Sequence, residues 1–95
     1  MNARFFIDPE TEASHIHNHG VDEEEVVDVL LSPGEDRPGW AGSRVVIGKT
    51  RAGRYLRAVY VPDPEPDSVF VITAYELVGK SLCAYRRRIR KKGRR

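Results

Sequence analysis

The sequence predicts an α+β domain in which two N-terminal helices precede a three- to four-stranded antiparallel sheet and a basic C-terminal helix. Three observations support this prediction. A capped helical segment begins near residue 22, β-branched runs separated by turn residues fill residues 43–74, and an amphipathic cationic segment closes the chain. The 95 residues have room for a single domain, spanning residues 1–95.

The first helix is expected from Asp8 to about His19. Asp8 followed by Pro9 is typical of a helix start, because Asp caps the first turn and Pro fits the first helical position. Gly20 would supply the left-handed stop. The apolar residues 5–7 before it are a candidate edge strand.

The second helix has the clearest signals. Asp22 is its expected cap, Glu25 completes a capping box, and Val21 can pack onto Val26 across the first turn. Its expected buried face consists of Val26, Val27, Leu30 and Leu31, and Ser32-Pro33-Gly34 should end it. Residues 35–42 read as a loop with room for one short strand.

Three strands are expected, at residues 43–50, 54–61 and 69–74, with a tight turn at residues 51–53 and a stiff proline-rich loop at residues 62–67. Alternation along the second strand places Leu56, Ala58 and Tyr60 on one face and Tyr55, Arg57, Val59 and Val61 on the other. The third strand is almost continuously apolar, which predicts a central strand covered on both faces.

The C-terminal helix is expected from Glu76 onward. Its apolar stripe follows the spacing i, i+4, i+7 and i+11 through Val78, Leu82, Tyr85 and Ile89. The remaining positions are strongly cationic, and residues of about 90–95 are expected to be flexible without a bound polyanion.

Charge is divided unevenly along the chain. Residues 1–36 carry ten acidic residues and one basic residue, a balance of −9, whereas residues 37–95 carry fifteen basic and four acidic residues, a balance of +11. This asymmetry favours an anionic partner for the later part, with nucleic acid as the first candidate. Two alternatives remain open at this stage, neutralisation of the basic end by the acidic segment and simple solvation of the tail.

Other features narrow the class of protein. The N-terminus lacks a signal-peptide core, and no apolar run is long enough to cross a membrane, so no membrane association is expected. The single cysteine, Cys83, cannot form an internal disulfide, which favours a cytoplasmic location. No cofactor motif is present.

Three segments, in order, resemble one known family. They are His19-Gly20-Val21 before an acidic helix, the hairpin segments Val45–Thr50 and Gly53–Leu56, and Val71–Ala74 before a basic helix carrying Tyr85. Together they resemble the BrnT-like toxins of the RelE superfamily, and also a neighbouring group of uncharacterised RelE-like domains. The resemblance implies a RelE-like fold and a bacterial ribonuclease of a type II toxin–antitoxin module, held inactive by a cognate antitoxin.

The chain departs from the family pattern at several positions. Thr11 stands where the family has Lys, Tyr75 where it has Arg, and Ser81 near where it has Glu. These departures motivate an alternative function, a non-catalytic RelE-like module that binds nucleic acid or protein. A homodimer, in which the basic tail docks on the acidic first part of another copy, is a further alternative.

Metal-free RNA cleavage requires an acid, a base and cations around the phosphate. The candidate catalytic residues are His15, His19, Arg57 and Tyr75. The candidate RNA-binding residues are Lys49, Arg51, Arg54, Lys80, Arg86, Arg87, Arg88 and Arg90. Structural alternatives remain open at this stage, because the histidines could be surface residues and Arg57 could pair with an acid. No metal site is expected, since the histidine pair lacks a third ligand.

Overall fold

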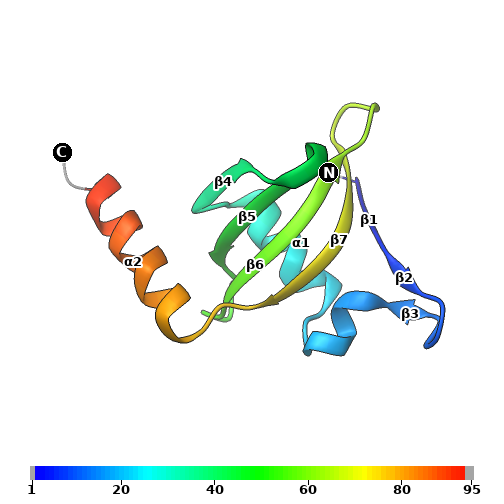
Figure 1. Ribbon diagram of the computed structural model, residues 1–95, viewed down its shortest axis with the longest axis horizontal. Coiled ribbons are helices and arrows are strands. Elements are labelled where there is room, and N and C mark those ends of the chain that lie inside the picture. The colour runs from blue at the N-terminus through cyan, green and yellow to red at the C-terminus, as the bar shows by residue number, and fades with distance from the viewer. Residues whose placement is uncertain (1, 94–95) are drawn as a thin grey trace.

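A computed structural model describes residues 2–93 and shows an α+β protein (Figure 1). Its elements are β1 (Asn2–Phe5), β2 (Ile7–Asp8), β3 (Ala13–Ser14), the 3-10 helix η1 (His15–His19), α1 (Glu23–Leu31), β4 (Glu35–Pro38), the 3-10 helix η2 (Trp40–Gly42), β5 (Arg44–Lys49), β6 (Tyr55–Pro62), β7 (Ser68–Glu76) and α2 (Gly79–Gly93).

The main sheet has five strands in the order β1-β7-β6-β5-β4. Strands β4 to β7 pair antiparallel, whereas β1 pairs parallel with β7, and β2 and β3 form a separate two-stranded sheet. The predicted layout, with two N-terminal helices and three or four antiparallel strands, is therefore wrong. The parallel pairing joins residues that are far apart in the sequence, such as Asn2 and Ser68. No local sequence pattern encodes a contact over that separation.

The predicted first helix is absent, and the β2–β3 hairpin and η1 take its place. Asp8 begins a turn, because its side-chain Oδ1 accepts a hydrogen bond from the Glu10 amide at 2.9 Å and its carbonyl accepts one from the Glu12 amide at 2.8 Å. Only Ile16 of η1 is buried, so a long helix here would have had little apolar surface to pack. Gly20 does adopt the predicted left-handed conformation, with φ of 70°.

Helix α1 is confirmed. The Asp22 amide donates to Glu25 Oε1 at 3.1 Å, and the helix ends at Leu31 just before the predicted breaker. Its buried face differs from the prediction, because Val26, Val29 and Leu30 face the core while Leu31 is 57% exposed.

The core lies between one face of the sheet, α1 and η1; α1 sits behind the sheet in Figure 1, and η1 lies near the lower end of β7. Leu56, Ala58 and Tyr60 of β6 are buried on this face, as the alternation predicted. The other side chains of β6 are half-buried on the opposite face, which we call the open face. The predicted division of this strand is confirmed.

Strand β7 lies inside the sheet, between β1 and β6, as predicted. However, it is not covered on both faces. Val71 and Ala74 are fully buried, whereas Ile72 is 37% exposed beside an irregularity in the pairing with Val59 and Tyr60. The apolar sequence of β7 thus reflects its position inside the sheet, although only one of its two faces is fully buried.

Helix α2 begins at Gly79, because β7 continues to Glu76. Val78 consequently falls outside the helix and is 62% exposed, while Tyr85 is buried and Leu82 and Ile89 are partly buried. The helix extends from one end of the sheet (Figure 1), and the final two residues of the segment expected to be flexible lie outside the described residues. Neither helix of residues 2–93 combines the length and apolarity needed to span a membrane.

Candidate nucleic-acid interface

A cleft of about 490 Å³ lies between α2, the end of the β5–β6 hairpin and the turn after α1. Three cations line it, Lys49 from β5 and Arg86 and Arg90 from α2. Two aromatic rings, Tyr55 of β6 and Tyr85 of α2, lie among them. The cleft therefore combines positive charge with aromatic surface, the combination used to hold single-stranded nucleic acid.

The side of α2 that packs on the sheet fixes the shape of this cleft. Tyr85 is 4% exposed and packs with Ile47 and Leu77, and its ring lies edge-on to Tyr55 with centroids 6.0 Å apart. Burial raises the pKa of Tyr85, so its hydroxyl is protonated at neutral pH. A Cβ on Gly34 would lie 1.8 Å from the Tyr85 hydroxyl oxygen, so the turn after α1 needs glycine there.

An ion pair between Arg88 and Glu35 also holds α2 against the sheet. Arg88 Nε and Nη2 donate to the two Glu35 carboxylate oxygens at 2.7 and 2.9 Å. This hydrogen bonding raises the pKa of Arg88. Arg88 therefore anchors α2 to β4, and its charge is already balanced by a carboxylate.

The cations at the mouth of the cleft are held by an aromatic ring. Lys49 Nζ lies 5.8 Å and Arg86 Cζ 5.1 Å from the Tyr55 ring centroid. Within residues 2–93, no carboxylate pairs with either side chain. Because a ring face attracts a cation without neutralising it, both charges stay available to phosphate.

The four candidate catalytic residues lie in one row that crosses β7 near its C-terminal end. The His15 and His19 ring centroids are 5.2 Å apart, and the His19 and Tyr75 centroids are 6.2 Å apart. Arg57 lies opposite Tyr75 in the β6–β7 ladder, with its Cζ 6.0 Å from the Tyr75 ring centroid. Separate elements thus bring together residues that the sequence places up to 60 positions apart.

Two features of this row bear on its chemistry. His15 Nδ1 lies 3.7 Å from Asp8 Oδ2, and the pKa of Asp8 is lowered by hydrogen bonds from the Glu10 amide and the Asn18 side chain, so Asp8 is a charged partner for His15. At the other end, Arg57 Nε is buried and has no hydrogen-bond partner among the described residues.

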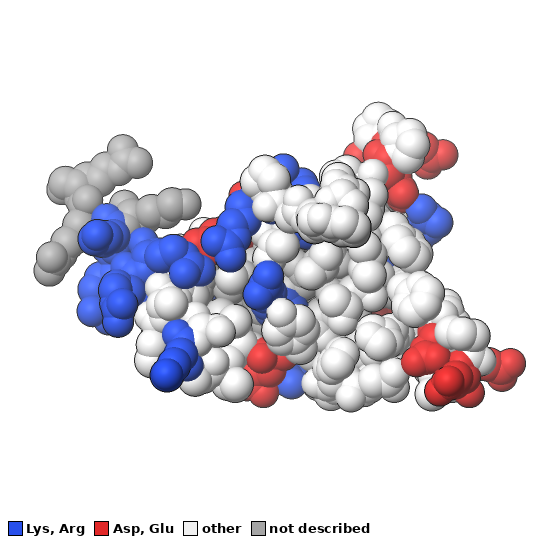
Figure 2. All heavy atoms as spheres, viewed as in Figure 1, with Lys and Arg blue, Asp and Glu red and all other residues white. Residues whose placement is uncertain are grey.

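Charge on the open face is strongly polarised, as Figure 2 shows. Cations gather over α2 at one end of the molecule, whereas acidic residues gather over the β2–β3 hairpin and the loop of residues 62–67 at the other. The acidic end of the molecule thus combines residues from both parts of the sequence, because the loop of residues 62–67 belongs to the basic part. A polyanion would be drawn toward the α2 end.

One family matches the chain, described as "Domain of unknown function (DUF4258)", over residues 14–76. The chain belongs to the DUF4258 family. Comparisons with curated proteins and with solved structures gave no significant match. The matched segment of the DUF4258 domain runs from η1 to the end of β7 and so contains the row of His15, His19, Arg57 and Tyr75. Helix α2, which supplies the other wall of the cleft, lies beyond that segment.

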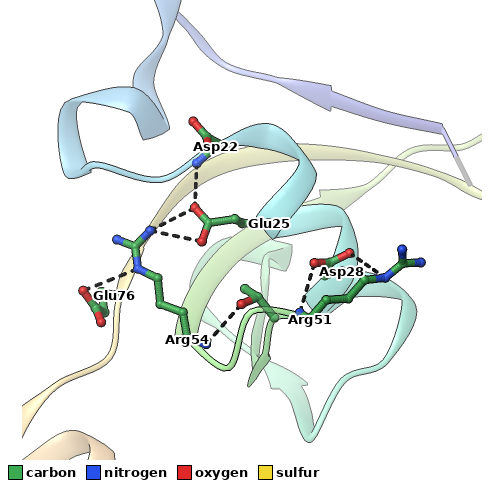
Figure 3. A network of polar contacts seen from close by, with 7 residues as sticks. Asp22, Glu25, Asp28, Arg51, Arg54 and Glu76 are labelled. Carbon is green, nitrogen blue, oxygen red and sulfur yellow. Dashed lines mark hydrogen bonds and ion pairs between the residues drawn. The ribbon is translucent and has the colours of Figure 1, made fainter.

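Two of the predicted RNA-binding arginines of the DUF4258 domain are bound by acidic residues of the core side (Figure 3). Arg54 Nη1 lies 2.9 Å from Glu25 Oε1, and Arg54 Nε lies 3.4 Å from Glu76 Oε1. Arg51 Nε lies 3.6 Å from Asp28 Oδ1, although its side chain is 89% exposed. Arg54 therefore joins α1, β6 and β7, and lies outside the cleft.

The other predicted cations on α2 are distributed around the helix. Lys80 and Arg87 are exposed and do not line the cleft. At 100° per residue, Arg87 lies on the side of the helix opposite Tyr85. Sequence reasoning missed Tyr55 and Gly34 as cleft residues. The alternation of β6 placed Tyr55 on the open face, but it could not predict the contacts of Tyr55 with Tyr85 and Arg86, because these residues of α2 lie 30 or more residues further along the chain.

Proposed function

We propose that this DUF4258 domain is a toxin-like RNA-binding protein of the type II toxin–antitoxin kind, which holds single-stranded RNA in the cleft beside α2. The observation that carries this proposal is the set of three cations, Lys49, Arg86 and Arg90, around two tyrosine rings, and none of the three pairs with a carboxylate of residues 2–93. Phosphates would pair with the cations while a base stacks on Tyr55, which is half-buried, since Tyr85 is buried.

The row of candidate catalytic residues extends this surface toward β7. Tyr55 and Arg57 are two residues apart on the same face of β6, about 7 Å along the strand. A strand of RNA leaving the cleft can therefore reach Arg57 and Tyr75 within about one nucleotide. We propose that Arg57 binds the scissile phosphate there, and that His19 and His15 supply the proton transfers of a metal-independent cleavage.

RNA binding is tested with a fluorescent single-stranded oligonucleotide of twelve nucleotides and anisotropy at several salt concentrations. The double variant Arg86→Ala/Arg90→Ala should reduce the slope of log affinity against log salt by about 1.4, because two phosphate contacts are lost. The matched control, Lys80→Ala/Arg87→Ala, removes the same charge from the same helix outside the cleft. Equal losses in both variants would contradict binding in the cleft.

Cleavage is tested by incubating the same RNA with the protein in EDTA and separating the products. Cleavage should leave 2′,3′-cyclic phosphate ends, and His19→Gln should slow it by about 100-fold or more without changing RNA affinity. In cells, regulated expression without an antitoxin should arrest growth. Normal growth and intact RNA would refute the toxin proposal.

The alternative is a non-catalytic module. It is favoured by the packing of His15, which is half-buried between the Phe6 ring at 5.9 Å and the Asp8 carboxylate. RNA binding that depends on Arg86 and Arg90 but is never followed by cleavage would establish this alternative and exclude the ribonuclease.

A further inference from the structure

Within residues 2–93, β1 pairs only with β7, so its outer edge has no strand partner. β1 is the last strand of the sheet on its side, and its even-numbered amides point inward, with Asn2 N donating to Asp67 O at 2.8 Å and Phe6 N to Val71 O at 2.9 Å. Because amide direction alternates along a strand, the amides of Ala3 and Phe5 point away from the sheet. An exposed strand edge of this kind is a template for another strand.

A groove of about 550 Å³ runs beside this edge, between β1 and α1. Its apolar lining comes from Ala3 and Phe5 of β1 and from Val27 and Leu31 of α1. Leu31 is 57% exposed, although it belongs to the helix that covers the core. The sequence had predicted Val27 and Leu31 as core residues, and here they remain uncovered or half-covered beside the open edge.

The rim of the groove is acidic. Glu23, Glu24 and Asp28 lie along it, with a single cation, Arg51. Glu23 accepts a hydrogen bond from the Ser14 hydroxyl and Asp28 pairs with Arg51. Within the part of the chain that the structure describes, Glu24 has no hydrogen bond or ion pair. The rim therefore presents negative charge that repels nucleic acid and attracts a cation.

We propose that this edge and groove bind an extended segment of another protein whose groove-facing side chains, at every second position, are apolar except for one basic residue. The segment would add as a strand to β1, place its apolar side chains over Phe5 and Leu31, and direct its cation to Glu24 on the same side of the sheet. Strand addition fits better than helix docking, because a helix would leave the outward amides of Ala3 and Phe5 unpaired.

A second copy of this chain fits the groove poorly. Its basic segment is α2, whose apolar side chains Leu82, Tyr85 and Ile89 already pack on its own sheet. Among the side chains that the structure describes, the exposed side of α2 offers cations and the small residues Ser81 and Cys83, but no large apolar residue to fill the groove. The lining of the groove shares no residue with the lining of the RNA cleft, so this inference does not depend on the proposed function.

The direct test uses a fluorescent seven-residue peptide with Val at its first, third and seventh positions, Lys at its fifth and Thr between them (the Lys/Val peptide), so that Val and Lys share one face. The charge control replaces the Lys by Glu (the Glu/Val peptide). The Lys/Val peptide should bind at low salt, and its binding should slow hydrogen exchange of the Ala3 and Phe5 amides by about tenfold or more in NMR spectra. Equal binding of the Glu/Val peptide, or binding without protection of those two amides, would overturn the proposal.

Variants then locate the contact. Glu24→Lys should weaken binding of the Lys/Val peptide about fivefold, because an attraction becomes a repulsion, whereas Glu65→Lys, at a residue that does not line the groove, should not. Tighter binding of a helix-forming peptide of Lys, Leu and Ala than of the Lys/Val peptide would contradict strand addition and indicate helix docking. Self-association in light scattering that Glu24→Lys abolishes would assign the groove to a second copy. RNA affinity should stay unchanged in Glu24→Lys, which separates this site from the cleft.

Discussion

The packing of the Tyr85 hydroxyl against Gly34 positions the cationic helix α2. The Tyr85 hydroxyl occupies the space that a Cβ at residue 34 would fill, 1.8 Å from the oxygen. The turn after α1 is therefore the surface against which α2 docks, and Tyr85 is the only fully buried side chain described on that helix.

Gly34→Ala should displace α2 and lower the free energy of unfolding by about 1–3 kcal/mol, as overpacking does elsewhere. Urea denaturation followed by tyrosine fluorescence measures this effect. The double variant Gly34→Ala/Tyr85→Phe removes the clashing oxygen and should recover part of the loss, leaving a residual contact at 3.0 Å to Cζ. Additive losses in the double variant would show that the two residues do not interact.

Asp63 is a residue whose charge stabilises the fold at ordinary pH. It accepts hydrogen bonds from Arg4 at 2.6 Å and from the Ser68 hydroxyl at 2.6 Å, and these bonds lower the pKa of Asp63 from its ordinary value of 3.8. A lowered pKa in the folded state means that the stabilisation is present above pH 3.8 and is lost as the pH falls below that value.

Urea midpoints measured from about pH 5 down to about pH 2 should therefore fall, and Asp63→Asn should fall less steeply over this range because the titrating carboxylate is gone. Glu65→Gln in the same loop is the matched control and should follow the unmodified protein. A parallel decrease in the Asp63→Asn variant would show that other carboxylates carry the acid sensitivity.

At the scale of elements, Arg54 holds three of them together. Its guanidinium bridges Glu25 of α1 and Glu76 of β7, while its amide donates to the Thr50 hydroxyl at 3.1 Å in the turn before β6. Although burial alone would lower the pKa of Arg54, the two carboxylates more than offset it and the pKa is raised. The half-buried guanidinium is thus a structural cation.

Arg54→Ala should lower the free energy of unfolding by about 1–3 kcal/mol, because Glu25 and Glu76 then lose their common partner. Arg51→Ala, a nearby arginine whose side chain is 89% exposed, should change it by less than about 0.5 kcal/mol. Urea denaturation of the two variants makes the comparison, and similar losses in both would contradict a specific role for Arg54.

The molecule as a whole consists of a packed sheet-and-helix body and a helix that extends beyond it. The body buries its core between α1, η1 and the sheet, whereas α2 contacts the body mainly through Tyr85, Leu82, Ile89 and the Arg88–Glu35 pair. A helix with so few buried side chains should open locally without unfolding the body.

Hydrogen exchange should therefore be faster for the amides of α2 than for those of β6 and β7, which lie inside the sheet. Addition of single-stranded RNA should slow exchange in α2 if RNA bridges the helix and the hairpin. NMR or mass spectrometry measures both effects. Equal protection of α2 and β6 would mean that the helix and body unfold as one unit.

Local signals in the sequence predicted the elements that depend on neighbouring residues. Asp22 and Glu25 predicted the start of α1, and the alternation of residues 55–61 predicted which side chains of β6 face the core. The apolar stripe of Leu82, Tyr85 and Ile89 predicted the side of α2 that packs on the sheet. The same kind of signal failed at Asp8-Pro9, because a cap residue also begins a turn, and only the available burial decides between the two.

Contacts between distant residues were decided by the tertiary structure alone. The residue types and the cationic end followed from sequence, but the pairing of β1 with β7, the Tyr55–Tyr85 contact, and the row from His15 to Arg57 depend on how whole elements pack. The same packing bound Arg54 to two carboxylates and left Arg86 beside an open cleft, although both had looked alike as phosphate ligands. Periodicity reports which side of an element faces inward, whereas the partner it meets there is set by the burial of the entire chain.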